Sequence, residues 1–339
     1  MHALKPTGQT AVTIETPILF LVFNRPDVTQ VVFEEIRKAR PKQLFIAGDG
    51  PRSHVEGDAD RCQQVRDIFK NVDWDCEVKT NFREENLGCG KAVSGALTWF
   101  FQHVDQGIIL EDDCVPDPTF FTFCEENLQR YENDPRVMLI SGSSFQKEPR
   151  GEGSYYFSRL AHIWGWATWK RVWDLYDFRI LSYTDYEKSG SIKEFHSNPA
   201  VQSHFSDIFE MMHSKPIDTW DYQLFFKIVE NNGLCINPNV NLVTNIGFGP
   251  DATHTLDSTS SNANARRYSI DKIIHPATVA VDQEADDYSL EYVFGVNMNP
   301  LERLDTVAAP QEASPAAAAP KRGVHRLLRW IARSVRARL

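Results

Sequence analysis

The stretch Gly107–Phe121, "GIILEDDCVPDPTFF", joins a short apolar run to three consecutive acids and then to a segment with helical spacing. A continuous apolar run of this length is typical of a strand that is covered on both faces. The acids Glu111, Asp112 and Asp113 repel one another at neutral pH, so we expect a positive group beside them. A buried strand that ends in a charged turn before a helix is a unit of α/β proteins.

The same unit recurs along the first 150 residues. Apolar or alternating runs at 18–23, 43–48, 76–82, 107–111 and 137–144 are predicted strands, and they alternate with helical patterns at 27–40, 54–72, 86–104 and 117–134. This alternation predicts an α/β fold, with a mostly parallel sheet flanked by helices on both faces.

Polar turns follow the strands of this predicted sheet. They are Asn24-Arg25-Pro26, Asp49-Gly50, Asn86-Leu87-Gly88 and Glu111-Asp112-Asp113. Because ligands of such sheets bind at the carboxyl ends of the strands, these turns predict a common site.

Carboxylates at a strand end can hold a hard cation. Mg²⁺ and Mn²⁺ take one or two protein carboxylates and complete their shell with water and substrate phosphates. The alternative is a helix N-terminus decorated with acids, which the helix dipole favours. The position of the triplet beside the other polar turns favours the cation, so we expect Mn²⁺ or Mg²⁺.

The composition indicates the cellular environment in which the chain is expected to work. The 339 residues are 42% hydrophobic and 24% charged, and no apolar run reaches the length of about 18 residues that spans a bilayer. The N-terminus lacks the apolar region of a signal peptide, so we expect a cytoplasmic protein with a polar leader at 1–16. The six cysteines include no CxxC pair, which favours reduced thiols over zinc or disulfides.

The motif "IILEDDCVPDPTFF" resembles the DxD-type signature of GT-A nucleotide-sugar glycosyltransferases. It is most similar to the inverting N-acetylglucosaminyltransferases that carry an EDD triplet after the fourth strand, and the order of motifs agrees over residues 17–255. The resemblance implies a GT-A type (Rossmann-like) fold with a nucleotide-sugar-binding half at 17–150 and a mixed acceptor-binding half at 151–304. It implies metal-dependent transfer from a nucleotide-diphosphate donor, expected to be a UDP-sugar, with inversion, in glycan or polysaccharide synthesis.

The resemblance also implies roles for individual residues. Six residues would bind the donor. Arg25 would contact the diphosphate and Asp49 the uracil or ribose, while Asn86 and Lys91 would flank the donor. Glu111 would contact the sugar, and Asp112 the ribose or a metal-bound water. Asp113 would bind the metal directly, and His254 in "NIGFGPDATHT" would complete its shell. A surface arginine, a turn aspartate and a structural histidine are the alternatives at Arg25, Asp49 and His254.

An inverting transfer needs a general base on the acceptor hydroxyl. "IDTWDYQ" offers Asp221 and Asp218, of which we favour Asp221 because it follows Trp220, while helix capping is the alternative for both. Among the clustered tryptophans, Trp166 is the candidate for stacking on the acceptor, against core packing.

The C-terminus differs from the rest. A Pro/Ala linker at 305–320 precedes a basic amphipathic tail at 321–339, which holds seven Lys and Arg residues and no acid. We expect this tail to contact an anionic membrane surface from the cytoplasmic side, which would suit a glycan or lipid-linked acceptor; a partner-binding helix or a solvated end are the alternatives. The acidic remainder argues against nucleic-acid binding.

Three other functions share parts of this pattern. A sugar-nucleotide nucleotidyltransferase would want a glycine-rich loop after the first strand, and "LVFNRPDVT" has no glycine. A non-catalytic nucleotide-sugar-binding protein of the same fold would bind donor without transfer. A phosphatase-like hydrolase would need a DxDxT-type nucleophile loop, which is absent from the sequence.

Overall fold

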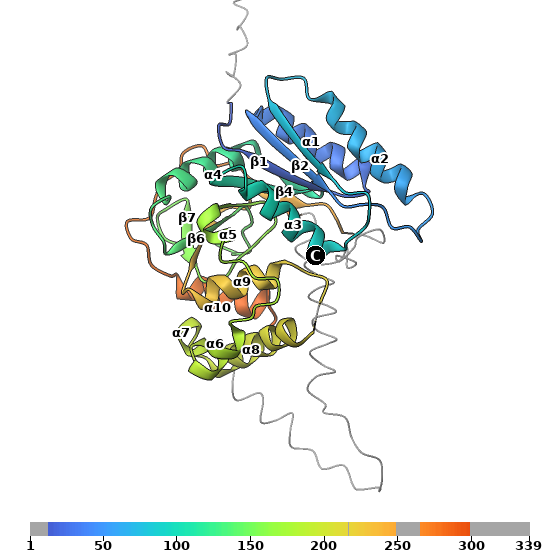
Figure 1. Cartoon of the computed structure of the whole chain (residues 1–339). Coiled ribbons are helices and arrows are strands. Elements are labelled where there is room, and N and C mark those ends of the chain that lie inside the picture. The colour runs from blue at the N-terminus through green and yellow to red at the C-terminus, as the bar shows by residue number, and fades with distance from the viewer. Residues whose placement is uncertain (1–12, 216, 249–264, 299–339) are drawn as a thin grey trace, which may run out of the picture.

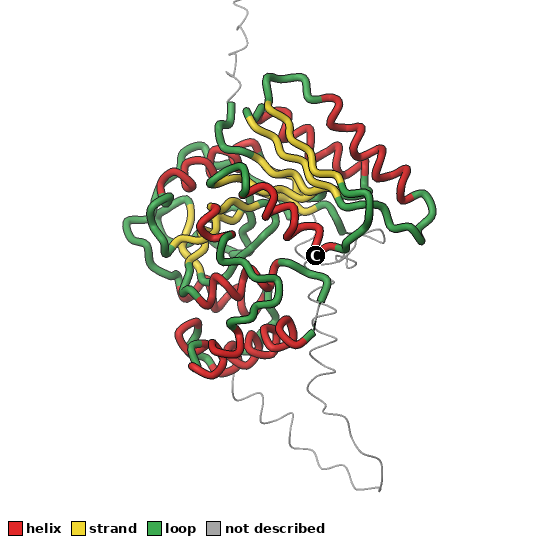
Figure 2. The backbone as a smooth tube through the Cα atoms, in the orientation of Figure 1, coloured by secondary structure: helices red, strands yellow, loops and turns green. Residues whose placement is uncertain are grey.

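The first predicted strand sets the pattern for the sheet. Ile18–Val22 form β1, and all five side chains are buried, as expected when helices cover both faces. Helix α1 (Pro26–Ala39) begins with a proline, whose fixed φ suits the first helical position, and ends where Arg40 takes a left-handed conformation. The computed structural model describes residues 13–215, 217–248 and 265–298 (Figures 1 and 2).

Within the described residues, eight strands form one twisted sheet. In order across the sheet they are β3 (Glu77–Phe82), β2 (Gln43–Gly48), β1, β4 (Gln106–Glu111), β8 (Trp166–Trp169), β6 (Val137–Ser141), β9 (Leu234–Pro238) and β7 (Tyr155–Ser158). The β3-β2-β1-β4 block is parallel, β8 is antiparallel to both its neighbours, β6 and β9 are parallel, and β7 is antiparallel. The predicted α/β architecture with a mostly parallel sheet is confirmed.

Helices cover both faces of the parallel block (Figure 1). Helices α2 (Asp58–Ile68) and α4 (Pro118–Arg130) contact α1 on one face, and α3 (Cys89–Phe101) packs on β1 and β2 from the other, next to α5 (Lys170–Trp173). Aromatic contacts join the layers: Phe20 meets Phe69 of the short 3-10 helix Phe69–Asn71, and Phe45 meets Phe100 of α3. The alternating strands and helices therefore build a three-layer core.

The tryptophan-rich segment contributes a strand that the sequence analysis did not predict. Trp166–Trp169 form β8, with all four side chains buried, and insert between β4 and β6. Four residues are too few to show a strand period, and the partners of β8 lie far away in the sequence. The predicted fifth strand, β6, therefore pairs with β8 and β9 and is not adjacent to β4.

The second half adds a helical layer and a small sheet. Helices α6 (Tyr183–Ser189), α7 (Ile192–Phe195), α8 (Pro199–Ser214), α9 (Asp221–Glu230) and α10 (Gln283–Tyr292) surround a second apolar cluster, rich in phenylalanine. Strand β10 (Val243–Asn245) pairs with β5 (Cys114–Pro116), directly after the acidic triplet. Strands from both sides of residue 150 share the main sheet, so one core joins the two halves.

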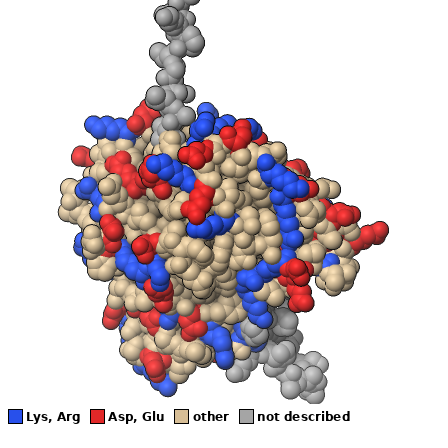
Figure 3. Space-filling view, turned by 45° about the horizontal axis from the view of Figure 1, so that its top comes forward, with Lys and Arg blue, Asp and Glu red and all other residues tan. Residues whose placement is uncertain are grey.

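Several predicted features fall outside the described residues. These are His254, the linker 305–320, the tail 321–339 and residues 1–12 of the predicted leader. Ile14, inside that predicted leader, is buried against the fold. None of the described helices has the length and apolar character needed to cross a membrane. All six cysteines are free in the structure. Figure 3 shows basic and acidic side chains interspersed on the visible face.

Candidate functional site

Glu111 ends β4, Asp112 and Asp113 form the turn between β4 and β5, and an arginine pairs with these two aspartates. Asp112 and Asp113 are only 5% and 7% exposed. Arg25, at the end of β1, donates from Nε to Asp112 Oδ2 at 3.3 Å and from Nη2 to Asp113 Oδ2 at 2.9 Å, and Nη2 also contacts Asp112 Oδ1. The positive group expected beside the triplet is thus a guanidinium from the neighbouring strand.

Burial and neighbouring charges shift the pKa values of the groups in this cluster. Burial alone would lower the pKa of Arg25, but Asp112 and Asp113 outweigh it and raise that pKa above its usual value. Burial, with help from the charges of Asp113 and Asp112, raises the pKa of Glu111 well above its ordinary range. The described residues offer the Glu111 carboxylate no hydrogen bond. Glu111 is therefore the member of the triplet that is open to a ligand.

A cavity of about 310 Å³ opens at the carboxyl edge of the parallel strands. It gathers seven of the predicted residues: Arg25, Asp49, Asn86, Glu111, Asp112, Asp113 and Asp218. Its walls also include apolar side chains of the strands and of α3: Leu21, Val22, Ala47, Ala92, Val93 and Ala96. A volume of this kind, apolar with a few convergent polar groups, is the usual form of a small-molecule site.

Asp49 holds the loop between β3 and α3. Its carboxylate accepts the N–H groups of Gly50 at 2.9 Å, Leu87 at 3.0 Å and Gly88 at 3.1 Å, and the Asn86 side-chain amide at 3.0 Å. Burial raises the pKa of Asp49, and these donors oppose the rise. Asp49 and Asn86, both predicted donor ligands, line the cavity, but they also bind each other.

Asp218 holds the other side of the same loop. Its two carboxylate oxygens accept the N–H groups of Cys89 at 3.1 Å and Gly90 at 2.8 Å, at the start of α3. Gly88 has φ +83°, and a Cβ there would lie 2.6 Å from Asp218 Oδ2, so this close approach requires glycine. Asp218 therefore caps a helix, which was the alternative to its role as a base.

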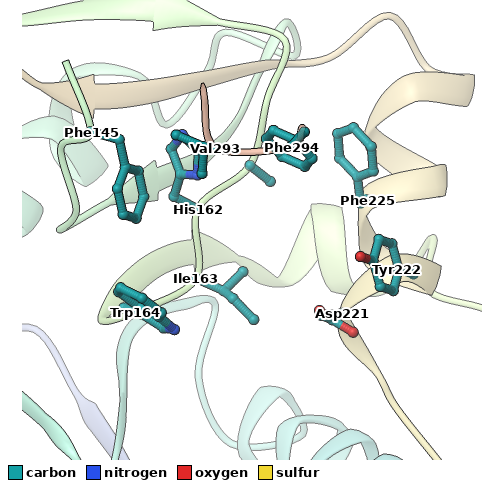
Figure 4. Close-up of a pocket in the computed structure, with 10 residues that line it drawn as sticks. Phe145, His162, Ile163, Trp164, Asp221, Tyr222, Phe225, Val293 and Phe294 are labelled. Atoms are coloured by element: carbon teal, nitrogen blue, oxygen red, sulfur yellow. The ribbon is translucent and has the colours of Figure 1, made fainter. Parts of the chain in front are cut away.

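Asp221, the other candidate base, lies in a second pocket (Figure 4). The first residue of α9, it accepts a hydrogen bond from the Thr219 hydroxyl. Apolar and aromatic side chains line this pocket, among them Phe145, Trp164, Tyr222 and Phe294. Burial is the largest cause that raises the pKa of Glu111 and of Cys89, which line the first cavity, and the charge of Asp221 adds to it. Asp221 thus stands close to both pockets.

Two predicted site residues lie elsewhere. Lys91 is exposed and borders a groove on the outer side of α3, because the cavity face of that helix carries Cys89, Ala92, Val93 and Ala96. Trp166 is fully buried in β8, where it stacks on Trp220 with ring centroids 5.5 Å apart. The prediction that Trp166 contacts the acceptor does not fit this burial, and core packing accounts for the residue.

The structure adds residues that the sequence analysis did not single out. Arg52, Asn81 and Arg83 line the cavity from the ends of β2 and β3. Fully buried Asp58 at the start of α2 fixes Arg52 and Asn24 through hydrogen bonds, and the Arg52 side chain holds the pKa of Asp58 well below its usual range. Arg52 and Arg83 follow predicted strands, so the positional rule that selected Arg25 and Asp49 also covers them, whereas Asn81 lies inside its strand, β3.

The residues of the triplet fit a hard cation in their chemistry. Carboxylate oxygens are suitable ligands, and Mg²⁺ or Mn²⁺ needs only one or two of them when substrate phosphates complete the shell. A Cβ on Gly247 would lie 1.9 Å from Asp113 Oδ2, so the close approach of this backbone to the carboxylate requires glycine. In the part of the chain that the structure describes, no group of three or more His, Cys, Asp or Glu side chains is arranged to hold a metal.

Comparison with known proteins gives likenesses to solved structures alone. No family model and no curated protein matches the sequence. A cytidylyltransferase from Leptospira borgpetersenii is 14% identical, with 56% of this chain and 71% of that chain covered and a TM-score of 0.31. A UDP-glucose pyrophosphorylase solved with UDP-glucose is 13% identical, with 43% and 62% covered and a TM-score of 0.25.

Mouse xyloside xylosyltransferase 1 is 10% identical, with 64% of this chain and 81% of that chain covered and a TM-score of 0.32. At these identities and scores, the activity of the present chain has to be argued from its own residues.

Proposed function

We propose that the protein is a metal-dependent glycosyltransferase, which moves a sugar from a nucleotide-diphosphate donor, a UDP-sugar, to an acceptor hydroxyl with inversion. The observation that carries the proposal is the cavity at the carboxyl edge of β1 to β4, where Arg25 and the acidic triplet meet. Nucleotides bind to such sheets at this edge.

The diphosphate of the donor would bind at the β1 and β4 end of the cavity. The Arg25 guanidinium can fork onto phosphate oxygens, and Asp113, with Asp112, would hold Mn²⁺ or Mg²⁺. When bound, the cation would stabilise the negative charge that develops on the departing diphosphate. The open carboxylate of Glu111 would accept hydrogen bonds from hydroxyls of the donor sugar.

Asp221 is the better candidate for the general base. Both Asp218 oxygens already accept N–H groups of α3, whereas Asp221 borders the second pocket and acts electrostatically on Glu111 in the first. A carboxylate between the two pockets could take the proton from an acceptor hydroxyl as it attacks the sugar from the face opposite the diphosphate. The acceptor, a glycan or lipid-linked sugar, would then occupy the aromatic pocket.

Calorimetry with UDP, with and without Mn²⁺, tests the proposal. We expect metal-dependent binding to the wild type and at least tenfold weaker binding to Asp113→Ala. Lys91→Ala is the matched control, because Lys91 lies outside the cavity, and it should bind UDP as the wild type does. If no nucleoside diphosphate binds under any metal condition, the proposal is wrong.

A further inference from the structure

Two polar side chains at the end of β3 line the cavity, and the charge of one of them, Arg83, acts on Asp49. Asn81 is the fifth residue of β3 and Arg83 follows the strand; both are half-buried and belong to the cavity wall. Within residues 13–215, 217–248 and 265–298, neither side chain makes a hydrogen bond or ion pair. Half-buried donors and acceptors of this kind are suited to a ligand, because a buried polar group needs a partner.

Asp49, the residue first expected to contact the base, has little capacity left. It accepts from three backbone N–H groups and the Asn86 amide, and a carboxylate offers about four lone-pair sites. The turn behind it is fixed as well, since a Cβ on Gly50 would lie 2.3 Å from the Glu85 backbone. Recognition of a base therefore falls to the neighbouring strand end.

The sheet order places Asn81 and Arg83 at the right distance from the phosphate end. The strands run β3-β2-β1-β4, so the end of β3 is three strand spacings, about 14 Å, from the triplet on β4. With the diphosphate at Arg25 and the triplet, a nucleoside laid along this edge reaches β3 with its base. Ala92, Val93 and Ala96 of α3 form an apolar wall there, which suits a flat ring.

We propose that Asn81 and Arg83 read the nucleobase of the donor and select uracil over guanine. The inference rests on the proposed function and deepens it. The uracil edge presents an acceptor, a donor and an acceptor. The Asn81 amide can donate to one carbonyl and accept from the ring N–H, and Arg83 can donate to the second carbonyl. Guanine presents two adjacent donors, for which this pair of side chains has one acceptor, so one donor would stay unpaired.

The test compares nucleotide affinities by calorimetry at fixed Mn²⁺. UDP, GDP, CDP and ADP are titrated into the wild type, Asn81→Asp and Arg83→Met. We expect the wild type to bind UDP at least tenfold more tightly than GDP, which is the discrimination of one well-formed edge contact. Asn81→Asp replaces the amide donor with a second acceptor and should reduce the UDP-to-GDP ratio about tenfold. Arg83→Met should weaken UDP binding about tenfold and GDP binding less.

Lys79→Gln is the matched control. Lys79 lies two residues before Asn81 in β3, its ammonium covers the Phe45 ring, and it does not line the cavity. This control should leave all four affinities unchanged. Ratios between nucleotides on one variant are insensitive to a small unfolded fraction, so a loss of stability cannot imitate the result.

Other outcomes overturn the inference in distinguishable ways. If GDP, CDP or ADP binds the wild type as tightly as UDP, or if Asn81→Asp keeps the wild-type ratio, the two side chains do not select uracil. If Arg83→Met weakens all four nucleotides equally, Arg83 acts as a general anion ligand and the base assignment is wrong. In each of these cases nucleotides still bind, whereas failure of the proposed function would show as no binding at all.

Discussion

At the scale of single residues, Arg25 compensates the negative charges of Asp112 and Asp113 in the acidic triplet. Without the guanidinium, two carboxylates that are each less than a tenth exposed would face each other uncompensated. Removing one partner of a buried ion pair typically costs 3–5 kcal/mol, because the other charge stays buried and unpaired. Arg25 thus has a structural role in the free protein as well as its proposed role on phosphate.

Arg25→Ala should lower the free energy of unfolding by about 3 kcal/mol, the lower end of that range, because the Arg25 side chain keeps 22% exposure. Urea unfolding measures this, and added Mn²⁺ should stabilise the variant more than the wild type if Asp112 and Asp113 bind the cation. Arg37→Ala, which removes an exposed pair with Asp73, should have little effect. An Arg25→Ala variant with wild-type stability would show that the ion pair does not hold the site together.

The sequence predicts a site residue when its position after a strand is enough to place it. It does not predict a contact between residues that are far apart in the chain. Arg25, Asp49 and the triplet follow strands, so position alone places them at one edge. The pairing of Arg25 with Asp112 joins residues 87 positions apart, and no local pattern shows it. Lys91 borders the outer groove, because one helical position, about 100°, separates it from the cavity face of α3.

At the scale of elements, α10 is attached to the sheet through a buried carboxylate. Asp286 is 2% exposed and accepts hydrogen bonds from the Ser158 hydroxyl at the end of β7 and from the Arg159 N–H. Burial raises the pKa of Asp286 to about 7, against the hydrogen bonds and the charge of Arg159. The fold therefore favours the protonated form of this residue.

The consequence is a stability that falls as pH rises. An acid whose folded pKa lies above its unfolded pKa of about 4 stabilises fully below pH 4 and loses that contribution as pH rises through 7. The stability lost between pH 4 and pH 7 amounts to roughly 4 kcal/mol. Urea unfolding of wild type and Asp286→Asn between pH 5 and 8 should show the wild type losing stability relative to the variant. Parallel pH profiles would contradict the assignment.

The strands, too, are predicted from the sequence only where a local pattern shows them. β1, β2, β3, β4 and β6 were predicted, since each is an apolar or alternating run next to a helical pattern. β8 was not, because "WATW" is short, and its strand character comes from pairing with β4 and β6 on both sides. Its burial between two strands also explains why Trp166 cannot reach a ligand.

At the scale of the whole molecule, the chain segments before and after residue 150 share one sheet. β8 pairs with β4 and with β6, and β9 pairs with β6. Strands that follow residue 150 therefore pair with strands that precede it. Asp218 ties the second half to the loop at the start of α3. The cavity at the carboxyl edge of β1 to β4 therefore depends on chain segments from both sides of residue 150.

A fragment of residues 1–150 should consequently fail to fold by itself. It would leave β4 with one open edge and β6 with two, and it would expose the apolar surface that β8 covers. Near-UV and far-UV circular dichroism in urea measure this: the full chain should lose both signals together, while the fragment should lack a near-UV signal and a cooperative transition. A fragment that unfolds cooperatively would show that the first half is an independent domain, and the cavity at β1 to β4 could then form without Asp218.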